Sequence, residues 1–178
     1  LAVVAMAHSI GIPFATTAGA LQKFGGVARR FDLRGVDAGA TFVDDYAHLP
    51  AEIAAVLSAA RTAGEWKRVV AVFQPNRFNR MAELWPAYRD AFVDADLIVL
   101  TEIYPSGTAP IPGVTGRLVV DAVLEAHPAA QVVWLPDREE LTDYLACNMV
   151  EGDVCISMGC GDIATLPSEV IERRTEAR

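Results

Sequence analysis

Short runs of apolar residues alternate with amphipathic segments along most of this chain, and this alternation constrains the fold more than any other feature. Five runs are expected to be strands: 41–45, 68–73, 97–101, 131–135 and 154–158. The last four are hydrophobic almost throughout, which is typical of strands covered on both faces. The order predicts an α/β fold: a Rossmann-like, doubly wound, mostly parallel sheet of about six strands, with helices on both faces.

The segments between these runs have helical spacing, with apolar residues three and four positions apart. The stripes are Ile53, Val56, Leu57 and Ala60; Leu84, Tyr88, Ala91 and Phe92; Leu118, Val119, Ala122 and Val123; and Leu141, Tyr144 and Leu145. Asp137 and Glu140 have the spacing of a capping box, which predicts the start of the last of these helices.

A different region precedes the alternation. Helices are expected at about 2–11 and 17–24, and the polar segment 28–33 is expected to pair as an extra strand at the sheet edge. This edge strand is the one that can run antiparallel to its neighbour.

The pair Gly25-Gly26 predicts a boundary between two parts of the chain. Residues 1–24 are expected to be terminal helices of a preceding central domain or a linker, and residues 25–178 to form the α/β domain. Because Leu1 stands inside a helical pattern, we expect the chain to be part of a longer protein.

Composition and charge exclude several classes of protein. The chain has 178 residues, 52% of them hydrophobic, which is enough for one domain with a sizeable core. Fifteen Lys and Arg against 23 Asp and Glu give a net charge of −8, which disfavours nucleic acid and anionic membranes as partners. Three cysteines without C-x-x-C spacing predict no disulfide scaffold and no metal site, but small buried residues in a reducing, cytoplasmic setting.

The loops after the strands are the expected place for a functional site, since ligands bind beyond the carboxyl ends of parallel strands. Four polar loops follow the predicted strands: 44–48, 74–80, 102–107 and 159–162. They carry ionisable groups of both signs. Together they predict a mixed-charge pocket that suits a nucleotide and a carboxylated substrate.

Asp44 and Asp45 are adjacent, so in an extended strand their side chains point to opposite faces. One is expected to bind ribose hydroxyls and the other to cap the helix near Pro50. The alternative is that both are caps and solvated loop carboxylates. His48 is either a substrate contact or a structural histidine.

Arg77 and Arg80 are three residues apart and would share one face of a helical first turn. Two guanidinium groups there can hold a carboxylate or a phosphate bidentately. The alternative is that they are surface arginines that balance an acidic protein. Arg29 and Arg30 form a second basic pair. The alternative to a binding role is that they belong to a solvated hairpin.

Other nucleotide and catalytic motifs are absent from the sequence. Gly159-Cys160-Gly161 is only half of a dinucleotide fingerprint. The two lysines, Lys23 and Lys67, lie outside any glycine-rich loop, so a self-contained P-loop NTPase is excluded. Neither G-x-S-x-G nor H-E-x-x-H occurs.

Three ordered strings lie in the loops after the strands or just before the first strand: GVARRF at 26–31, VDDYAHLP at 43–50 and FQPNRFNR at 73–80. YPSG at 104–107 and PIPG at 110–113 follow them. With these motifs, about residues 1–166 resemble the C-terminal domain of the Mur ligase family, together with the last helices of the preceding domain.

The resemblance implies an ATP-dependent ligase of peptidoglycan synthesis and cell-wall biogenesis. In the most similar members, ATP activates the carboxylate of UDP-N-acetylmuramate as an acyl phosphate, and the amine of L-alanine attacks it. It also implies partner domains in the same polypeptide: one for the UDP-sugar, and a central one with the P-loop that binds most of the ATP and Mg²⁺. The chain alone would then be inactive, with no catalytic residue of its own.

Three residues match nucleotide-binding positions of the family. Arg30 matches the arginine that reaches the ATP phosphates, Asp45 matches the carboxylate that holds the ribose, and Tyr46 lies beside the adenine and the substrate.

His48, Arg77 and Arg80 match the group that handles the incoming amino acid and its carboxylate. The family usually has histidine at the positions of Leu49 and Asn76, and these differences leave the amino acid open. The alternatives are the related ligase that attaches a whole peptide to UDP-muramate, and a non-catalytic, flavodoxin-like binding module.

Overall fold

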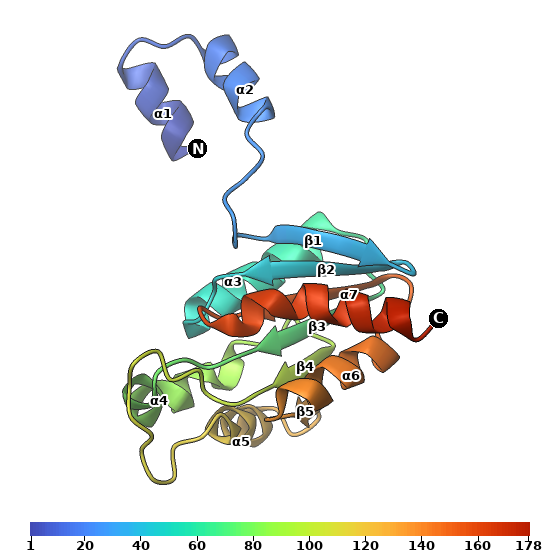
Figure 1. Ribbon diagram of the computed structural model, residues 1–178. Coiled ribbons are helices and arrows are strands. Elements are labelled where there is room, and N and C mark those ends of the chain that lie inside the picture. The colour runs from blue at the N-terminus through green and yellow to red at the C-terminus, as the bar shows by residue number, and fades with distance from the viewer.

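A six-stranded sheet forms the centre of the computed structural model, which describes residues 1–178 (Figure 1). The strand order is β1-β2-β6-β3-β4-β5. The strands are β1 (Asp32–Asp37), β2 (Ala40–Asp45), β3 (Arg68–Phe73), β4 (Leu97–Leu100), β5 (Val132–Trp134) and β6 (Asp153–Met158). Only β1 is antiparallel to its neighbour, so the predicted, mostly parallel α/β sheet is confirmed.

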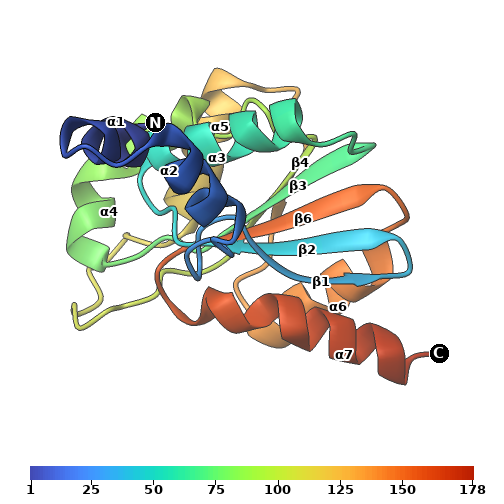
Figure 2. The same cartoon turned by 90° about the horizontal axis from the view of Figure 1, so that it is seen from above.

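Helices cover both faces of this sheet, as Figure 2 shows, with α3 and α5 on one side and α6 and α7 on the other. The helices after β2 are α3 (Pro50–Ala63), α4 (Phe78–Leu84), α5 (Arg117–Ala126), α6 (Arg138–Asn148) and α7 (Leu166–Glu176). Two 3₁₀ helices complete the set: η1 (Trp85–Asp90) lies between α4 and β4, and η2 (Asp162–Thr165) lies between β6 and α7.

The central strands are apolar on both faces because each face has its own core. In β3, Val69, Ala71 and Phe73 pack in the core beneath α3 and α5, while Val70 and Val72 pack in the core beneath α6 and α7. This alternation has the period of two that a strand imposes. Continuous hydrophobic runs are therefore the pattern that this doubly covered sheet requires.

The edge strand lies later in the chain than predicted. β1 begins at Asp32, and the preceding residues form a turn in which Arg29 and Phe31 have positive φ angles of 59° and 46°. The Phe31 N–H donates to the Asp45 carboxylate at 2.7 Å, which holds the turn against the end of β2. Further along β1, the pairing with β2 shifts between Leu33 and Gly35, as in a β-bulge.

Two N-terminal helices, α1 (Ala2–Ser9) and α2 (Phe14–Gln22), pack on each other and stand apart from the sheet (Figure 1). Both were predicted, although their bounds differ by a few residues. Their large apolar side chains are largely exposed, including those of Val3, Met6 and Phe14. No helix in the structure is long and apolar enough to cross a membrane.

The stripe from Leu84 to Phe92 does not form one α-helix. It is divided among the end of α4, η1 and the turn that follows η1, with Pro86 just after the junction of the two helices. A proline has no N–H to donate to the preceding turn, so the α-helical bonding pattern stops there. The burial was predicted correctly: Tyr88 and Phe92 are buried, and both rings lie against Phe73.

The cap of α6 and the burial of the cysteines were both predicted from the sequence. Asp137 does cap α6, because its carboxylate accepts hydrogen bonds from the N–H groups of Glu139 and Glu140. Of the cysteines, only Cys155 is buried, and burial raises the pKa of its thiol to about 12. Cys147 lies on the exposed face of α6 and Cys160 is half-buried, so the prediction of three buried cysteines was wrong.

Helix α3 is capped by its own glutamate. The Glu52 carboxylate accepts the N–H groups of His48 at 2.9 Å and Leu49 at 3.1 Å. The prediction that Asp44 or Asp45 caps this helix was therefore wrong. Burial disfavours the charged form of Glu52, but the two backbone hydrogen bonds outweigh it and lower its pKa.

Replacing Leu57 tests the core under α3. The side chain is fully buried, so Leu57→Ala should lower the free energy of unfolding by about 2–5 kcal/mol. Leu124→Ala removes the same atoms from an exposed position of α5 and should cost less than about 1 kcal/mol. Urea unfolding followed by circular dichroism measures both changes, and equal costs would contradict this core.

Replacing Glu52 by glutamine tests the charged cap of α3. The folded-state pKa of Glu52 lies below the usual 4.5, so its charge stabilises the fold fully above pH 4.5. This stabilisation is lost as the pH falls through the folded-state pKa. Glu52→Gln should therefore cost about 0.5–1 kcal/mol at neutral pH, and the difference from wild type should shrink in acid. Glu83→Gln, at an exposed position of α4, is the control. An effect of Glu52→Gln that does not change with pH would refute the charged cap.

Candidate functional site

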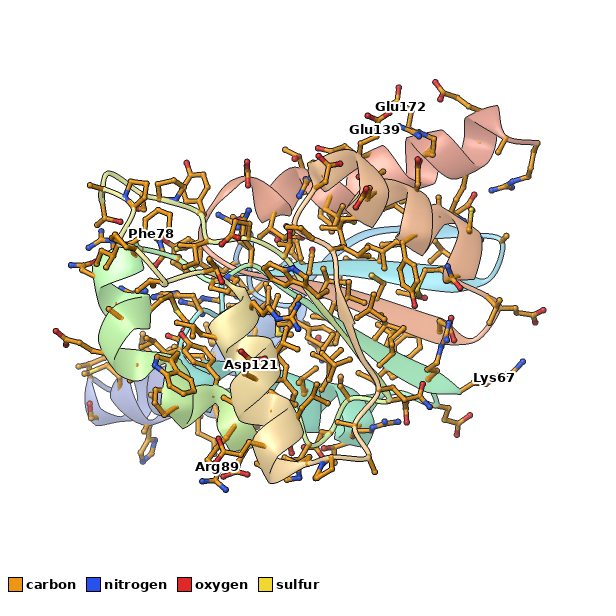
Figure 3. The ribbon with its side chains drawn as sticks, turned by 90° about the horizontal axis from the view of Figure 1, so that it is seen from below. Lys67, Phe78, Arg89, Asp121, Glu139 and Glu172 are labelled. Atoms are coloured by element: carbon orange, nitrogen blue, oxygen red, sulfur yellow. The ribbon has the colours of Figure 1, made fainter.

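The polar loops meet at the carboxyl edge of the sheet. In Figure 3, Lys67 precedes β3 and Phe78 follows it, and the two labels lie at opposite ends of the sheet. At the Phe78 end, Asn76 pairs with Tyr104 as an isolated β-bridge. The side chain of Gln74 donates to Asp162 at 2.8 Å, and the N–H of Gly159 donates to the Asp45 carbonyl. The predicted convergence of the four loops is confirmed.

The glycine turn after β6 is packed against protein groups. A side chain at Gly161 would lie 2.4 Å from the ring of Tyr104, so only glycine allows this approach. The N–H of Ile163 just beyond it donates to the Gln74 side chain. These contacts explain why half of a dinucleotide fingerprint occurs here: the glycines let the loops pack closely.

Asp45 organises the end of β2. Its carboxylate accepts the N–H of Ala47 at 2.8 Å and the N–H of Phe31 at 2.7 Å, and the residue is only 2% exposed. It therefore joins the turn before β1 to the loop after β2.

Asp44 has a different partner, which sequence reasoning missed. Its side chain is fully buried, and its Oδ2 accepts from Arg29 Nε at 3.0 Å, while Oδ1 has no hydrogen-bond partner. Burial raises the pKa of Asp44, and the neighbouring guanidinium partly opposes that shift. The two residues lie fifteen positions apart in the chain, a separation that carries no sequence signal of pairing.

Tyr46 presents an aromatic surface at this edge. The residue is 38% exposed, and its ring centroid lies 4.9 Å from the guanidinium carbon of Arg29 and 5.6 Å from that of Arg30. Cations over an aromatic face are attracted by its quadrupole. The ring of His48 meets Tyr46 edge-on at 5.5 Å.

His48 is held from several sides. Its Nδ1 lies 3.0 Å from the Tyr46 carbonyl and 3.5 Å from Glu52, and its own carbonyl accepts the O–H of Tyr88 at 2.7 Å. Burial raises the pKa of Tyr88 to about 12, so this hydroxyl stays a donor. The sequence placed Tyr88 only in the core. The signal of its second role, as a support for His48, was the hydroxyl group, which needs a hydrogen-bond partner when buried.

Arg77 and Arg80 do not share a helical face as predicted. Arg77 precedes α4 with a positive φ of 65°, and its N–H donates to the Tyr104 carbonyl. The side chain of Arg80, inside α4, donates to Asn76 Oδ1 at 2.6 Å. Asn76 is only 2% exposed, so it anchors the Arg80 guanidinium from the loop below.

The arrangement is suited to anions. Exposed Arg30 and Arg77 lie in loops at one edge of the sheet, and half-buried Arg80 lies beside them in the first turn of α4. Each guanidinium can bind a carboxylate or a phosphate. No group of three His, Cys, Asp or Glu side chains is arranged to hold a metal ion.

Comparison with known proteins agrees with these motifs. Residues 29–161 match the family described as Mur ligase, glutamate ligase domain. UDP-N-acetylmuramate–L-alanine ligase of Pelobacter propionicus is 41% identical over 92% of the chain. The corresponding enzyme of Rubrobacter xylanophilus is 43% identical over 97% of the chain. The chain spans only 35% and 39% of these two relatives.

Known structures share the fold as well. The crystal structure of UDP-N-acetylmuramate–alanine ligase from Thermotoga maritima superposes with a TM-score of 0.80 at 28% identity, over 98% of this chain and 36% of that one. A murein peptide ligase from Psychrobacter arcticus shares the fold with a TM-score of 0.69 at 22% identity, over 95% of this chain and 34% of that one. With most of its length matched to the family, the chain belongs to the Mur ligases and contains their C-terminal, glutamate ligase domain.

Proposed function

We propose that this chain is the C-terminal part of an ATP-dependent ligase that joins L-alanine to UDP-N-acetylmuramate in peptidoglycan synthesis. The observation that carries the proposal is the alignment of nearly the whole chain, at about 40% identity, with relatives named for that reaction. In the proposed reaction, the muramate carboxylate takes the γ-phosphoryl group of ATP to form an acyl phosphate. The amine of L-alanine then displaces phosphate and forms the amide.

The amino acid is proposed to bind among His48, Arg77, Arg80 and Tyr46. Guanidinium groups hold a carboxylate through short, charge-assisted hydrogen bonds. Support comes from the anchors of these groups: Arg80 is bonded to Asn76, and the His48 carbonyl is bonded to Tyr88. Groups held in this way lose little freedom when the substrate arrives, which favours a defined position of the attacking amine.

The nucleotide is proposed to bind near Arg30, Tyr46 and Asp45. Arg30 is exposed and free to contact phosphates, and Tyr46 offers its ring to the adenine. Both oxygens of the Asp45 carboxylate already accept backbone N–H groups, but each oxygen has a second lone pair.

Magnesium does not fit this chain on its own, because no cluster of three acidic, histidine or cysteine side chains is present. We therefore assign Mg²⁺ and the phosphate cradle to a central domain of the longer protein. This assignment agrees with the length of the relatives, of which the chain spans little more than a third.

Residues 1–24 are proposed to belong to that central domain, and residues 25–178 to the C-terminal domain. In support, none of the residues of α1 is buried, and only Thr17 is buried in α2. An apolar surface of this kind is typical of a segment that packs against another domain. The three free cysteines support the proposed cytoplasmic location.

A ligase that attaches a whole peptide to UDP-muramate is the second candidate. Leu49 and Asn76, where the family usually has histidine, leave the amino acid open, because both remove a titratable group near the proposed amine site. The Gln-Pro-x-Arg-x-x-Arg pattern at 74–80 favours the alanine ligase. The murein peptide ligase structure is 22% identical, a similarity that supports a common fold alone. Turnover of the full-length protein with L-alanine and with a tripeptide separates the two candidates, and no turnover with either would favour a non-catalytic module.

The chain of 178 residues should neither hydrolyse ATP nor form an amide by itself. Phosphoryl transfer depends on a metal and a phosphate cradle, which we assign to the central domain. Loss of the cradle should weaken ATP binding about a thousandfold, or about 4 kcal/mol. A coupled assay and calorimetry measure this, with the full-length protein as the control; micromolar binding by the chain alone would contradict an interdomain site.

In the full-length ligase, Arg77→Ala and Arg80→Ala should raise the KM for L-alanine about tenfold or more, equivalent to at least about 1.4 kcal/mol, and change the KM for ATP little. Arg80→Lys should also be costly, because lysine cannot bind bidentately. Arg117→Ala, at an exposed position of α5, is the matched control. Unchanged dependence on L-alanine in folded variants would make both arginines ordinary surface charges.

A further inference from the structure

We propose that the ion pair between half-buried Arg29 and buried Asp44 positions Arg30 for the nucleotide, so that Arg29 and Asp44 are positioning residues of the ligase. The inference rests on the proposed function, and it extends that function to two residues outside the groups proposed to bind the substrates.

Arg29 ties three segments together. Its Nε donates to Asp44 Oδ2 at the end of β2, and its Nη2 donates to the Gly159 carbonyl after β6 at 2.8 Å. Its own carbonyl accepts the N–H of Tyr46 at 2.8 Å. Its guanidinium also lies over the Tyr46 ring. One side chain and its peptide group thereby hold the turn before β1 against two strand ends.

Asp44 is costly to bury, and this cost argues for a specific role. A fully buried carboxylate with one oxygen unpaired is less favourable than a hydrophobic side chain of similar size in the same place. An apolar pair would fill the space, but it would not direct a guanidinium to both a carboxylate and the Gly159 carbonyl. The charge of Asp44 therefore fixes the Arg29 guanidinium in place, and with it the conformation of the turn.

Arg30 is the residue that this geometry controls. It lies between Arg29 and Phe31, which both have positive φ angles, and its N–H donates to the Val27 carbonyl at 3.1 Å. A positive φ is strained for such residues and persists only where neighbouring contacts hold it. The contacts of Arg29 with Asp44, and of Phe31 with Asp45, provide that hold on either side of Arg30.

A second ion pair in the same sheet, again between a half-buried arginine and a buried aspartate, provides a matched control. Arg68 donates to Asp153, which is 1% exposed, and both residues begin their strands, at the end of the sheet opposite the site. Its loss should lower the melting temperature without affecting one substrate more than another. The two pairs therefore distinguish positioning from stability alone.

The test uses Arg29→Lys and Asp44→Asn in the full-length ligase, with Arg68→Lys as the control. Lysine keeps the charge beside Asp44 but lacks the planar guanidinium, which donates to Asp44 and Gly159 from two separate nitrogens. We expect Arg29→Lys and Asp44→Asn to raise the KM for ATP tenfold or more, with a several-fold smaller rise in the KM for L-alanine, because Tyr46 is proposed to contact both substrates. Arg68→Lys should lower the melting temperature and leave both KM values within twofold.

A measurement without turnover separates this proposal from the proposed function. Hydrogen exchange of the Phe31 and Tyr46 amides in the 178-residue chain should become at least tenfold faster in Arg29→Lys and stay unchanged in Arg68→Lys. Unchanged exchange, or equal changes in both KM values, would overturn the positioning role. If exchange accelerates but the full-length wild type forms no amide, the turn is anchored as described and the proposed function fails.

Discussion

The parallel pairing of β6 between β2 and β3 is the constraint on which the site depends. β6 is the last strand in the chain, yet it lies in the centre of the sheet. Its carboxyl end therefore brings Gly159 beside Asp45 of β2 and places Asp162 beside Gln74 after β3. Without this strand, the loops that carry the arginines and the loop that carries the aspartates would have no common neighbour.

Much of the fold was predictable because the relevant signals are local. Continuous apolar runs identified the strands after β2, and spacing of three and four identified the helices between them. Predictions failed where one residue changed the local geometry: Pro86 divides a helical stripe, and the positive φ of Arg77 removes it from the helix. The edge strand was displaced because Asp45 holds Phe31 in a turn that a polar segment does not reveal.

The site was predictable only in part. Topology explains why the four polar loops meet, because carboxyl ends of parallel strands share one edge. The contacts that hold the individual groups link residues far apart in the chain, as in Arg29 with Asp44 and Tyr88 with His48. The sequence treats these residues separately: Arg29 as half of a basic pair, Asp44 as a ribose contact or a helix cap, and Tyr88 as a core residue. His48 is either a substrate contact or a structural histidine. Pairing between such positions depends on packing that a single sequence does not encode locally.

The two outer strands also affect how this chain behaves in solution at high concentration. An outer strand exposes unpaired N–H and C=O groups, which can template pairing with another molecule and lead to aggregation. Here β1 is interrupted by the shift between Leu33 and Gly35, and β5 has only three residues. Neither offers a long, regular ladder, so intermolecular sheet extension is disfavoured at both sides of the fold.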